Sequence, residues 1–235
     1  DWNKKAVHMN ERIHKSIYNE EFLNAINYED CESVLDVGCG VGNLSLRMAS
    51  LVKEVYSMDY SPKMLEHLQI NAREQNIENI TTLHNSWYDS WDEIPKTDIV
   101  IASRSMEVKN MKDALEKLNN KANKRVYLTY KVGGSFVDQK ILDVIQRDII
   151  KKPDYIYLIN ILYSMGINAS VNFIRSEGRS TLYTSKDKFI KSISWSISDL
   201  TKAEIQRLES YYDSLPSSRE KENEYVSWAI LSWSK

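Results

Sequence analysis

The residues with the clearest chemical meaning form one glycine-rich stretch near the start of the chain. A short apolar run that contains Asp36 is long enough for a single buried strand of a parallel sheet. Three glycines follow at alternate positions, Gly38, Gly40 and Gly42, and a helical pattern then runs through Leu51. A strand, a glycine turn and a helix in this order are typical of an α/β fold that binds a nucleotide-like ligand over the end of a strand.

The spacing of the glycines indicates which ligand is bound. A dinucleotide fingerprint has its third glycine three residues after the second, and this chain has Asn43 there. The carboxylate of Asp36 suits a ligand with an ammonium group better than one with a pyrophosphate. The segment V-L-D-V-G-C-G-V-G-N-L, with Cys39 inside the turn, resembles motif I of the class I S-adenosylmethionine-dependent methyltransferases. An ordinary tight turn and a dinucleotide site are the alternatives.

This resemblance implies a fold, a reaction and a cofactor. The fold is a three-layer, Rossmann-like α/β domain with a mostly parallel seven-stranded sheet and an antiparallel final strand. The reaction moves a methyl group from S-adenosylmethionine to an unidentified acceptor and leaves S-adenosylhomocysteine, with no metal expected. The chain also resembles an uncharacterised group of bacterial and archaeal methyltransferases of the small-molecule type. The resemblance implies that Asp36 and the glycine turn hold the methionine end of the cofactor.

An acidic residue, Asp59, ends the predicted second strand and lies 17 positions after Gly42. An acid at this distance, at the tip of the second strand, can accept hydrogen bonds from both ribose hydroxyls. Dinucleotide enzymes and methyltransferases share this device, so Asp59 indicates a ribose-bearing cofactor without choosing between them. The phrase M-D-Y-S-P-K-M-L again resembles the methyltransferases, in which the residue after the acid, here Tyr60, lies over the adenine or ribose.

The ends of the third and fourth predicted strands supply further candidates. The family usually has an acid for the adenine amine after the third strand, and Ser86 replaces it here, with Trp87 beside it. These two residues either contact the adenine or pack in the core. After the fourth strand, Ser103 is expected near the methionine part of the cofactor. Arg104 is the candidate cation for a substrate carboxylate or phosphate, unless it only caps the strand end or pairs with a helix acid.

An unusually apolar segment, residues 153–166, follows the fifth strand. Asp154 can cap the start of a helix there and Gly166 can end it. A helix that is apolar nearly all round is either buried or covers a ligand. Methyltransferases of small substrates often carry an insertion here, which makes Tyr155, Asn160 and Tyr163 candidate substrate contacts. A plain core helix is the alternative.

The remaining pattern predicts one domain over residues 1–235. We expect an N-terminal helical cap over 1–32, a cofactor-binding core over 33–131, a substrate-side insertion over 135–185, and C-terminal helices with a last strand over 186–235. Residues 169–175 and 179–184 read as extended segments. A capping box at 201–204 starts a late helix, and 225–233 alternates as a final strand near the sheet edge.

Composition limits the partners. The net charge is −2, with 31 basic and 33 acidic residues and no long basic run, so nucleic acid is an unlikely partner. Two cysteines are too few for a disulfide framework and lack zinc-type spacing, which favours the cytoplasm. No apolar run approaches the length of a membrane span. The sequence shows no signal peptide, and its first residue, Asp1, leaves open a leading segment that was removed.

The sequence assigns no catalytic residue. Methyl transfer from a sulfonium is an in-line displacement that depends mainly on positioning. Runs such as N-P-P-Y or a Pro-Cys nucleophile are absent, which disfavours two types of nucleic-acid base methylation. The acceptor is therefore expected to be a small molecule, with a protein side chain or tRNA behind it. Two other functions stay open: a non-catalytic S-adenosylmethionine-binding sensor or partner subunit, and an NAD-type oxidoreductase.

Overall fold

The structure, a computed structural model, describes most of the chain. The described residues are 2–4, 6–10, 16–133, 137, 139–148, 153–177, 185–194, 196–197, 199–215 and 225–235. The elements in chain order are η1 (Trp2–Lys4), α1 (Ala6–Asn10), α2 (Ile17–Ala25), β1 (Ser33–Val37), α3 (Ser45–Met48), β2 (Glu54–Asp59), α4 (Pro62–Glu74), β3 (Ile80–His84), β4 (Thr97–Ala102), α5 (Met111–Lys121), β5 (Ala122–Lys131), α6 (Gln139–Ile145), α7 (Tyr155–Ser164), β6 (Ser170–Glu177), α8 (Lys186–Ser194), α9 (Lys202–Ser214) and β7 (Tyr225–Ser234). The predicted extended segment 179–184 lies outside the described residues.

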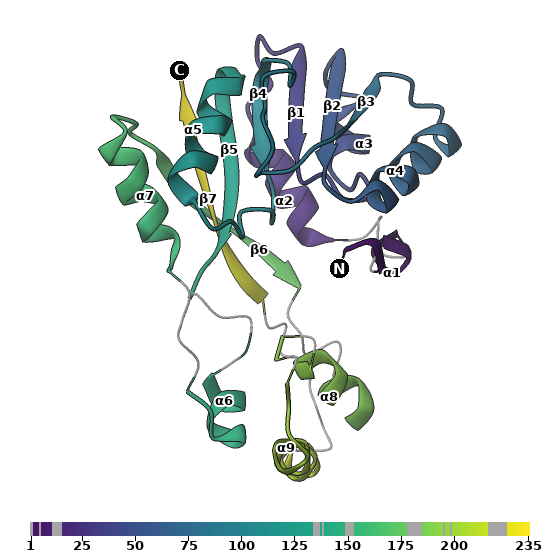
Figure 1. Cartoon of the computed structure of the whole chain (residues 1–235), viewed down its shortest axis with the longest axis vertical. Helices are drawn as coiled ribbons and strands as arrows, with labels where there is room; N and C mark the ends of the chain where they lie inside the picture. The colour runs from purple at the N-terminus through teal and green to yellow at the C-terminus, as the bar shows by residue number, and fades with distance from the viewer. Residues whose placement is uncertain are drawn as a thin grey trace.

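Within the described residues, the strands form one seven-stranded sheet in the order β3-β2-β1-β4-β5-β7-β6 (Figure 1). Strands β1 to β5 pair in parallel, and β7 pairs antiparallel with both β5 and β6. The short apolar runs of the first strands suit a parallel sheet that is covered on both faces. The predicted mixed sheet, with its antiparallel final strand, is confirmed.

The strand order reverses at β1, because β2 lies on one side of it and β4 on the other. Since β1 to β5 are parallel, their carboxyl ends meet at one edge of the sheet, which we call the carboxyl edge. In open α/β sheets, ligands bind outside this edge at the point where the strand order reverses. The glycine turn, Gly38–Gly42, leaves β1 at that point.

Helices cover both faces of the sheet, which gives the predicted three layers. One core cluster packs α5 and α7 against one face through residues such as Leu115 and Leu158. On the opposite face, Tyr18 and Phe22 of α2 pack with Met48 of α3 against the strands. Helix α4 lies on this second face, beside β2 and β3. Burial of these side chains supplies the main drive for folding.

Helices α6, α8 and α9 form a separate group, which we call the helical lobe. They pack on one another around their own cluster, which includes Ile145, Phe189 and Leu208. Figure 1 shows the lobe below the sheet, on the side of the carboxyl edge. The predicted insertion 135–185 is thus divided in space, because α6 belongs to the lobe whereas α7 and β6 belong to the sheet.

The helix after the glycine turn is shorter than the pattern predicts. Helix α3 ends at Met48, and Leu51 is half exposed. The chain must turn back toward β2 at this point, since the amides of Lys53 and Glu54 both donate to the carbonyl of Glu32, before β1. The apolar spacing at Leu51 therefore falls on a turn at the surface.

Side chains cap the starts of α4, α7 and α9, and the sequence predicts the caps at Asp154 and at Thr201. The Ser61 hydroxyl accepts from the amide of Met64 at the start of α4, and Pro62 is the first helical residue. Asp154 caps α7. A complete capping box joins Thr201 and Glu204 at the start of α9.

No helix within the described ranges is long and apolar enough to cross a bilayer. Among the same residues, no group of three or more His, Cys, Asp or Glu side chains is placed to hold a metal ion. Both cysteines are free thiols.

Candidate cofactor site

The glycine turn is fastened to the end of β2. The amides of Gly38 and Cys39 both donate to the carbonyl of Met58, at 2.7 and 3.0 Å. Gly38, Gly40 and Gly42 all have positive φ angles, of 77°, 56° and 93°. Glycine adopts this region without the steric cost that a Cβ brings, so the pattern read from the sequence is a backbone requirement.

The three glycines differ in what surrounds them. A Cβ on Gly38 would lie 2.4 Å from the Cβ of Ser105, and one on Gly42 would lie 2.9 Å from Leu68. These two positions are glycine because neighbouring side chains leave no room. A Cβ on Gly40 would meet nothing within 4 Å. Gly40 therefore presents bare backbone to open space, as a turn that receives a ligand must.

Asp59 is the last residue of β2, and its carboxylate is hydrogen-bonded to the glycine turn. Its Oδ2 accepts from the Gly40 amide at 2.9 Å, and its Oδ1 accepts from the Ser61 amide at 2.8 Å. The side chain is largely buried, and this burial raises the pKa of the Asp59 carboxyl even though the amide hydrogen bonds act in the opposite direction. Each carboxylate oxygen can accept further hydrogen bonds.

Asp36 is enclosed between β1, α3 and β2. The Ser45 hydroxyl donates to its Oδ2 at 2.7 Å, and Ser57 donates to Ser45 at 2.8 Å. Burial raises the pKa of Asp36 to about 7. The two serines were missed by sequence reasoning, although Ser45 is only the third residue after Gly42. Cys39 is buried in the turn, and burial raises the pKa of its thiol well above the ordinary value, so the thiol stays protonated.

The residues predicted for the adenine lie on the loop after β3 and beside β2. The indole N–H of Trp87 donates to the Ser105 carbonyl at 3.0 Å, and its ring packs on Trp91. The Ser86 hydroxyl accepts from the Tyr88 amide at 3.2 Å. Tyr60 is half exposed. The ring of Trp87 is thus fixed across the loops after β3 and β4, and Tyr60 projects beside the same edge.

The loop after β4 joins β1 to β5. The Ser105 hydroxyl donates to the carbonyl of Val37, the last residue of β1, at 2.6 Å. Ser103 shares a 2.7 Å hydrogen bond with the hydroxyl of Tyr18, which shares another of 2.6 Å with Thr129 on β5. Arg104 stands between the two serines, and its guanidinium lies over the Tyr18 ring. Tyr18 and Thr129 carry no motif, so the sequence offered no signal for them.

Helix α7 does not bring all three of its predicted contacts to the carboxyl edge. Its cap, Asp154, accepts from the amide of Gly133 just after β5, so Tyr155 lies near that edge. Tyr163 lies two turns further along the helix and is 74% exposed, and Asn160 is exposed as well.

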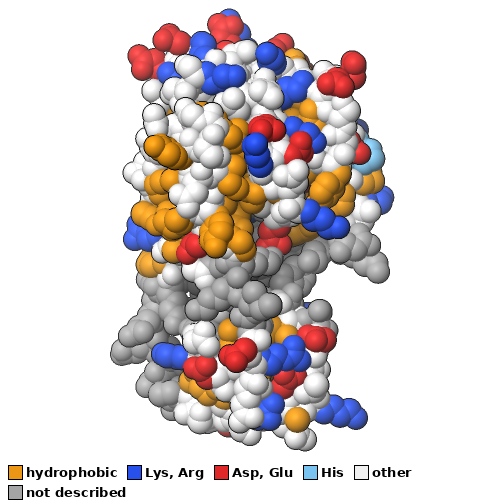
Figure 2. Space-filling model, turned by 60° about the vertical axis from the view of Figure 1, so that its left-hand side comes forward, with side chains coloured by type: hydrophobic (Ala, Val, Ile, Leu, Met, Phe, Trp, Pro, Cys, Tyr) orange, Lys and Arg blue, Asp and Glu red, His pale blue; other side chains and the backbone are white. Residues whose placement is uncertain are grey.

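The exposed residues Ile156, Tyr157, Tyr163 and Phe173 make this side of the molecule apolar. Figure 2, which brings the α7 side forward, shows hydrophobic side chains gathered on that face. Asn160 and Tyr163 therefore face solvent and are not gathered with the glycine turn.

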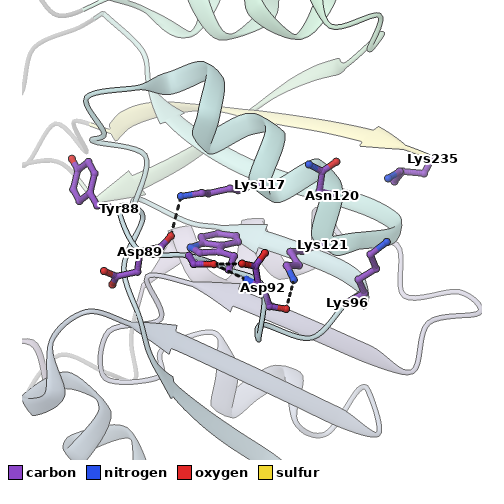
Figure 3. Close-up of a pocket in the computed structure, with 10 residues that line it drawn as sticks. Tyr88, Asp89, Asp92, Lys96, Lys117, Asn120, Lys121 and Lys235 are labelled. Atoms are coloured by element: carbon purple, nitrogen blue, oxygen red, sulfur yellow. Dashed lines mark hydrogen bonds between the residues drawn. The ribbon is translucent and has the colours of Figure 1, made fainter.

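A cavity of about 510 Å³ lies elsewhere, between α5 and the loop before β4 (Figure 3). Lys117 and Lys121 enter it, but their ammonium groups donate to backbone carbonyls of Asp89 and Ile94. None of the predicted cofactor or substrate residues lines this cavity. It is therefore a surface hollow in which two of the lining lysines, Lys117 and Lys121, hold the loop.

Two comparisons decide the family. A family model described as a methyltransferase domain matches residues 29–158. An uncharacterised protein of Haemophilus influenzae is 38% identical over 239 residues, which is 99% of this chain and 88% of the relative. This chain belongs to the methyltransferase domain family. The predicted resemblance to S-adenosylmethionine-dependent methyltransferases is confirmed, and the NAD-type oxidoreductase alternative is set aside.

Solved structures agree on the fold of this methyltransferase. A candidate methyltransferase of Bacillus halodurans has a TM-score of 0.61 at 13% identity, covering 92% of this chain and 97% of the other. Magnesium protoporphyrin IX methyltransferase of Synechocystis with bound SAH has a TM-score of 0.58 at 16% identity, covering 97% and 84%. An Aliivibrio salmonicida 23S rRNA (uracil-C5)-methyltransferase is 34% identical, but only over 33% of this chain and 18% of the enzyme.

Proposed function

We propose that this methyltransferase binds S-adenosylmethionine outside the carboxyl edge, between the ends of β2, β1 and β4, and transfers its methyl group to a small-molecule acceptor. The observation that carries the proposal is the pairing of Gly40 with Asp59. Gly40 offers open backbone, and the carboxylate beneath it is buried yet retains acceptor capacity.

The pairing suggests how the cofactor lies. Asp59 accepts from the ribose hydroxyls, while the glycine turn faces the methionine end. Asp36 lies behind the turn and carries only part of a negative charge near neutral pH, because its pKa is raised to about 7, and Ser103 lies on the other side of the turn. Tyr60, Ser86 and Trp87 border the place of the adenine.

Methyl transfer needs few protein groups beyond those that bind the two reactants. The acceptor nucleophile forms a bond to the methyl carbon as the carbon–sulfur bond breaks, and the sulfur keeps the electron pair. The acceptor then loses a proton to solvent or stays cationic. Rate depends on holding the two reactants in line, so positioning residues carry the catalysis.

The net charge of the chain favours a small-molecule acceptor over a nucleic acid. The chain carries a net charge of −2 and lacks a long basic run that would follow a nucleic-acid backbone. The rRNA methyltransferase of Aliivibrio matches only a third of this chain, so its RNA substrate does not support an RNA acceptor here.

The test is a calorimetric titration of the wild type and Gly40→Ala with S-adenosylmethionine, S-adenosylhomocysteine and NAD. We expect binding of the first two to the wild type, and at least a tenfold loss in Gly40→Ala because the methyl group occupies the space of the ligand. Gly166→Ala is the matched control, since Gly166 also has positive φ and open space around its Cβ. Its backbone strain is similar, at about 1–2 kcal/mol.

Equal losses in the two glycine variants would show that backbone strain alone weakens binding, and binding of NAD alone would overturn the proposal. Transfer of tritiated methyl groups separates an enzyme from a sensor. Label is expected in the small-molecule fraction of a bacterial extract. Binding without any transfer would favour the sensor or partner subunit.

A further inference from the structure

Arg104 has an unusual backbone and a fixed place. It is the second residue after β4 and precedes Ser105, whose hydroxyl donates to the end of β1 and whose side chain lies against Gly38. Its φ angle is +55°, a region that non-glycine residues seldom adopt, and its amide donates to the Thr129 hydroxyl at 3.0 Å. Such conformations cost energy and persist where surrounding contacts impose them. The strained backbone places this cation on the loop after β4, one residue before Ser105, which contacts the glycine turn.

The side chain of Arg104 rests on an aromatic platform. Its guanidinium carbon is 3.5 Å from the ring centre of Tyr18 and 5.1 Å from that of Trp228. The Tyr18 ring is almost fully buried and is held by its two hydroxyl partners. A guanidinium stacked on a ring face keeps its in-plane N–H groups free to bond a ligand.

The charge of Arg104 is not neutralised by a contact partner. Within the described ranges, no carboxylate lies within ion-pair distance of its guanidinium. The residue as a whole is exposed, although burial of the guanidinium among its neighbours lowers the pKa of Arg104. Glu177 acts on this charge through space, but its own oxygens accept from the amide of Ile17 and the hydroxyl of Ser16. Arg104 is thus a pre-positioned cation. Its side chain is hydrogen-bonded to Tyr18, and its remaining guanidinium N–H groups can bond a ligand.

We infer that Arg104 binds a carboxylate or phosphate group of the methyl acceptor. The inference rests on the proposed function, and it narrows the acceptor to a small anionic molecule. Arginine suits this role because its planar fork bonds two oxygens of such a group at once. An anion held on Arg104 fixes one end of the acceptor, while the nucleophilic atom faces the sulfonium. The carboxylate of the cofactor itself has the same chemistry, and the experiment must separate the two sources.

The first measurement compares Arg104→Met with the wild type by calorimetry against S-adenosylhomocysteine and 5′-methylthioadenosine, which lacks the amino-acid part. We expect both affinities to stay within twofold of the wild type. A loss for S-adenosylhomocysteine alone would show that Arg104 holds the carboxylate of the cofactor, which overturns the inference. Arg73→Met, at an exposed arginine of α4, is the control.

The second measurement uses inorganic phosphate as the probe, by ³¹P line broadening on the protein saturated with S-adenosylhomocysteine. We expect broadening with the wild type and Arg73→Met, and its loss in Arg104→Met. Equal broadening by all three proteins would overturn the inference.

The third measurement follows tritiated methyl transfer to an extract that is separated into anionic small molecules, other small molecules and RNA. Label is expected in the anionic small molecules, with about a tenfold or larger drop in Arg104→Met and partial rescue in Arg104→Lys. Label in either other fraction would contradict the inference. If the wild type binds no S-adenosylhomocysteine, the proposed function fails; if it binds and transfers but Arg104→Met does the same, only this inference fails.

Discussion

At the scale of single residues, the two acids of the candidate site are held in different ways. Asp59 accepts from two backbone amides, whereas Asp36 accepts from one hydroxyl and is more deeply enclosed. A carboxylate in apolar surroundings with few donors is costly to ionise, and the pKa of Asp36 rises to about 7 for this reason. The unliganded fold therefore carries an acid that is half neutral near neutral pH.

This difference predicts a pH-dependent stability. Because the folded pKa of Asp36 exceeds the unfolded value, the folded state binds the extra proton between about pH 4 and 7. The stabilisation is complete below this window and is lost as the pH rises through 7. The wild type loses this stabilisation at high pH, whereas Asp36→Asn has no carboxyl to titrate. We therefore expect the unfolding free energy of Asp36→Asn, relative to that of the wild type, to rise by about 2–4 kcal/mol between pH 4.5 and pH 8.

Urea unfolding of the unliganded protein at a series of pH values measures this effect. Asp92→Asn, at an exposed acid, should keep the pH profile of the wild type. Parallel profiles for the wild type and Asp36→Asn would mean that Asp36 is ionised throughout the range.

At the scale of elements, helix α2 depends on the edge strand β6. Its N-cap residue, Ser16, makes no side-chain cap of its own. Glu177 of β6 supplies one instead, since its carboxylate accepts from the amide of Ile17 at 2.6 Å and from the hydroxyl of Ser16 at 3.0 Å. Glu21 of α2 also pairs with Arg175 of β6. These contacts hold Tyr18, and with it the platform for Arg104.

Glu177→Gln tests this cross-element cap. The change keeps one acceptor oxygen but removes the negative charge from the helix start, so we expect a loss of about 1 kcal/mol of unfolding free energy at low salt. The loss should shrink at high ionic strength because salt screens partly exposed charges. Glu78→Gln, at an exposed loop acid, should change stability by much less. Equal effects of the two changes would remove the capping role.

At the scale of the whole molecule, the described residues pack around more than one centre. The sheet and its helices enclose two large clusters, one on each face, while the helical lobe has its own. Within the lobe, Arg147 forms ion pairs with Asp199 and Glu204, which joins α6 to the start of α9. Because the lobe has its own core, we expect it to unfold as a unit separate from the sheet.

Phe189→Ala tests this separation. Phe189 is fully buried against Tyr212, and its truncation should cost about 3–5 kcal/mol of local stability. We expect faster hydrogen exchange in α6, α8 and α9 and unchanged exchange in β1, β2 and β4. Leu115→Ala, in the sheet core, should speed exchange in the strands instead. A uniform change throughout the chain in Phe189→Ala would show a single cooperative unit.

The sequence by itself determined the features that depend on neighbouring residues. The glycine turn required positive φ at three positions, and all three have it. Helix caps at Ser61, Asp154 and Thr201 were readable because a cap and its partner are at most three residues apart. The strands before Tyr130 were readable from short apolar runs bounded by turns.

Only the tertiary structure decided which distant residues meet. Tyr18 lies 85 positions before Ser103 and 111 before Thr129, and nothing local marks these partners. The outward face of Tyr163 and the lobe formed by α6, α8 and α9 also followed from packing. Periodicity shows that a helix has an apolar side, but the sheet order decides what that side covers. The acids and glycines of the site could therefore be predicted from the sequence. The aromatic platform beneath Arg104 could be found only from the tertiary structure.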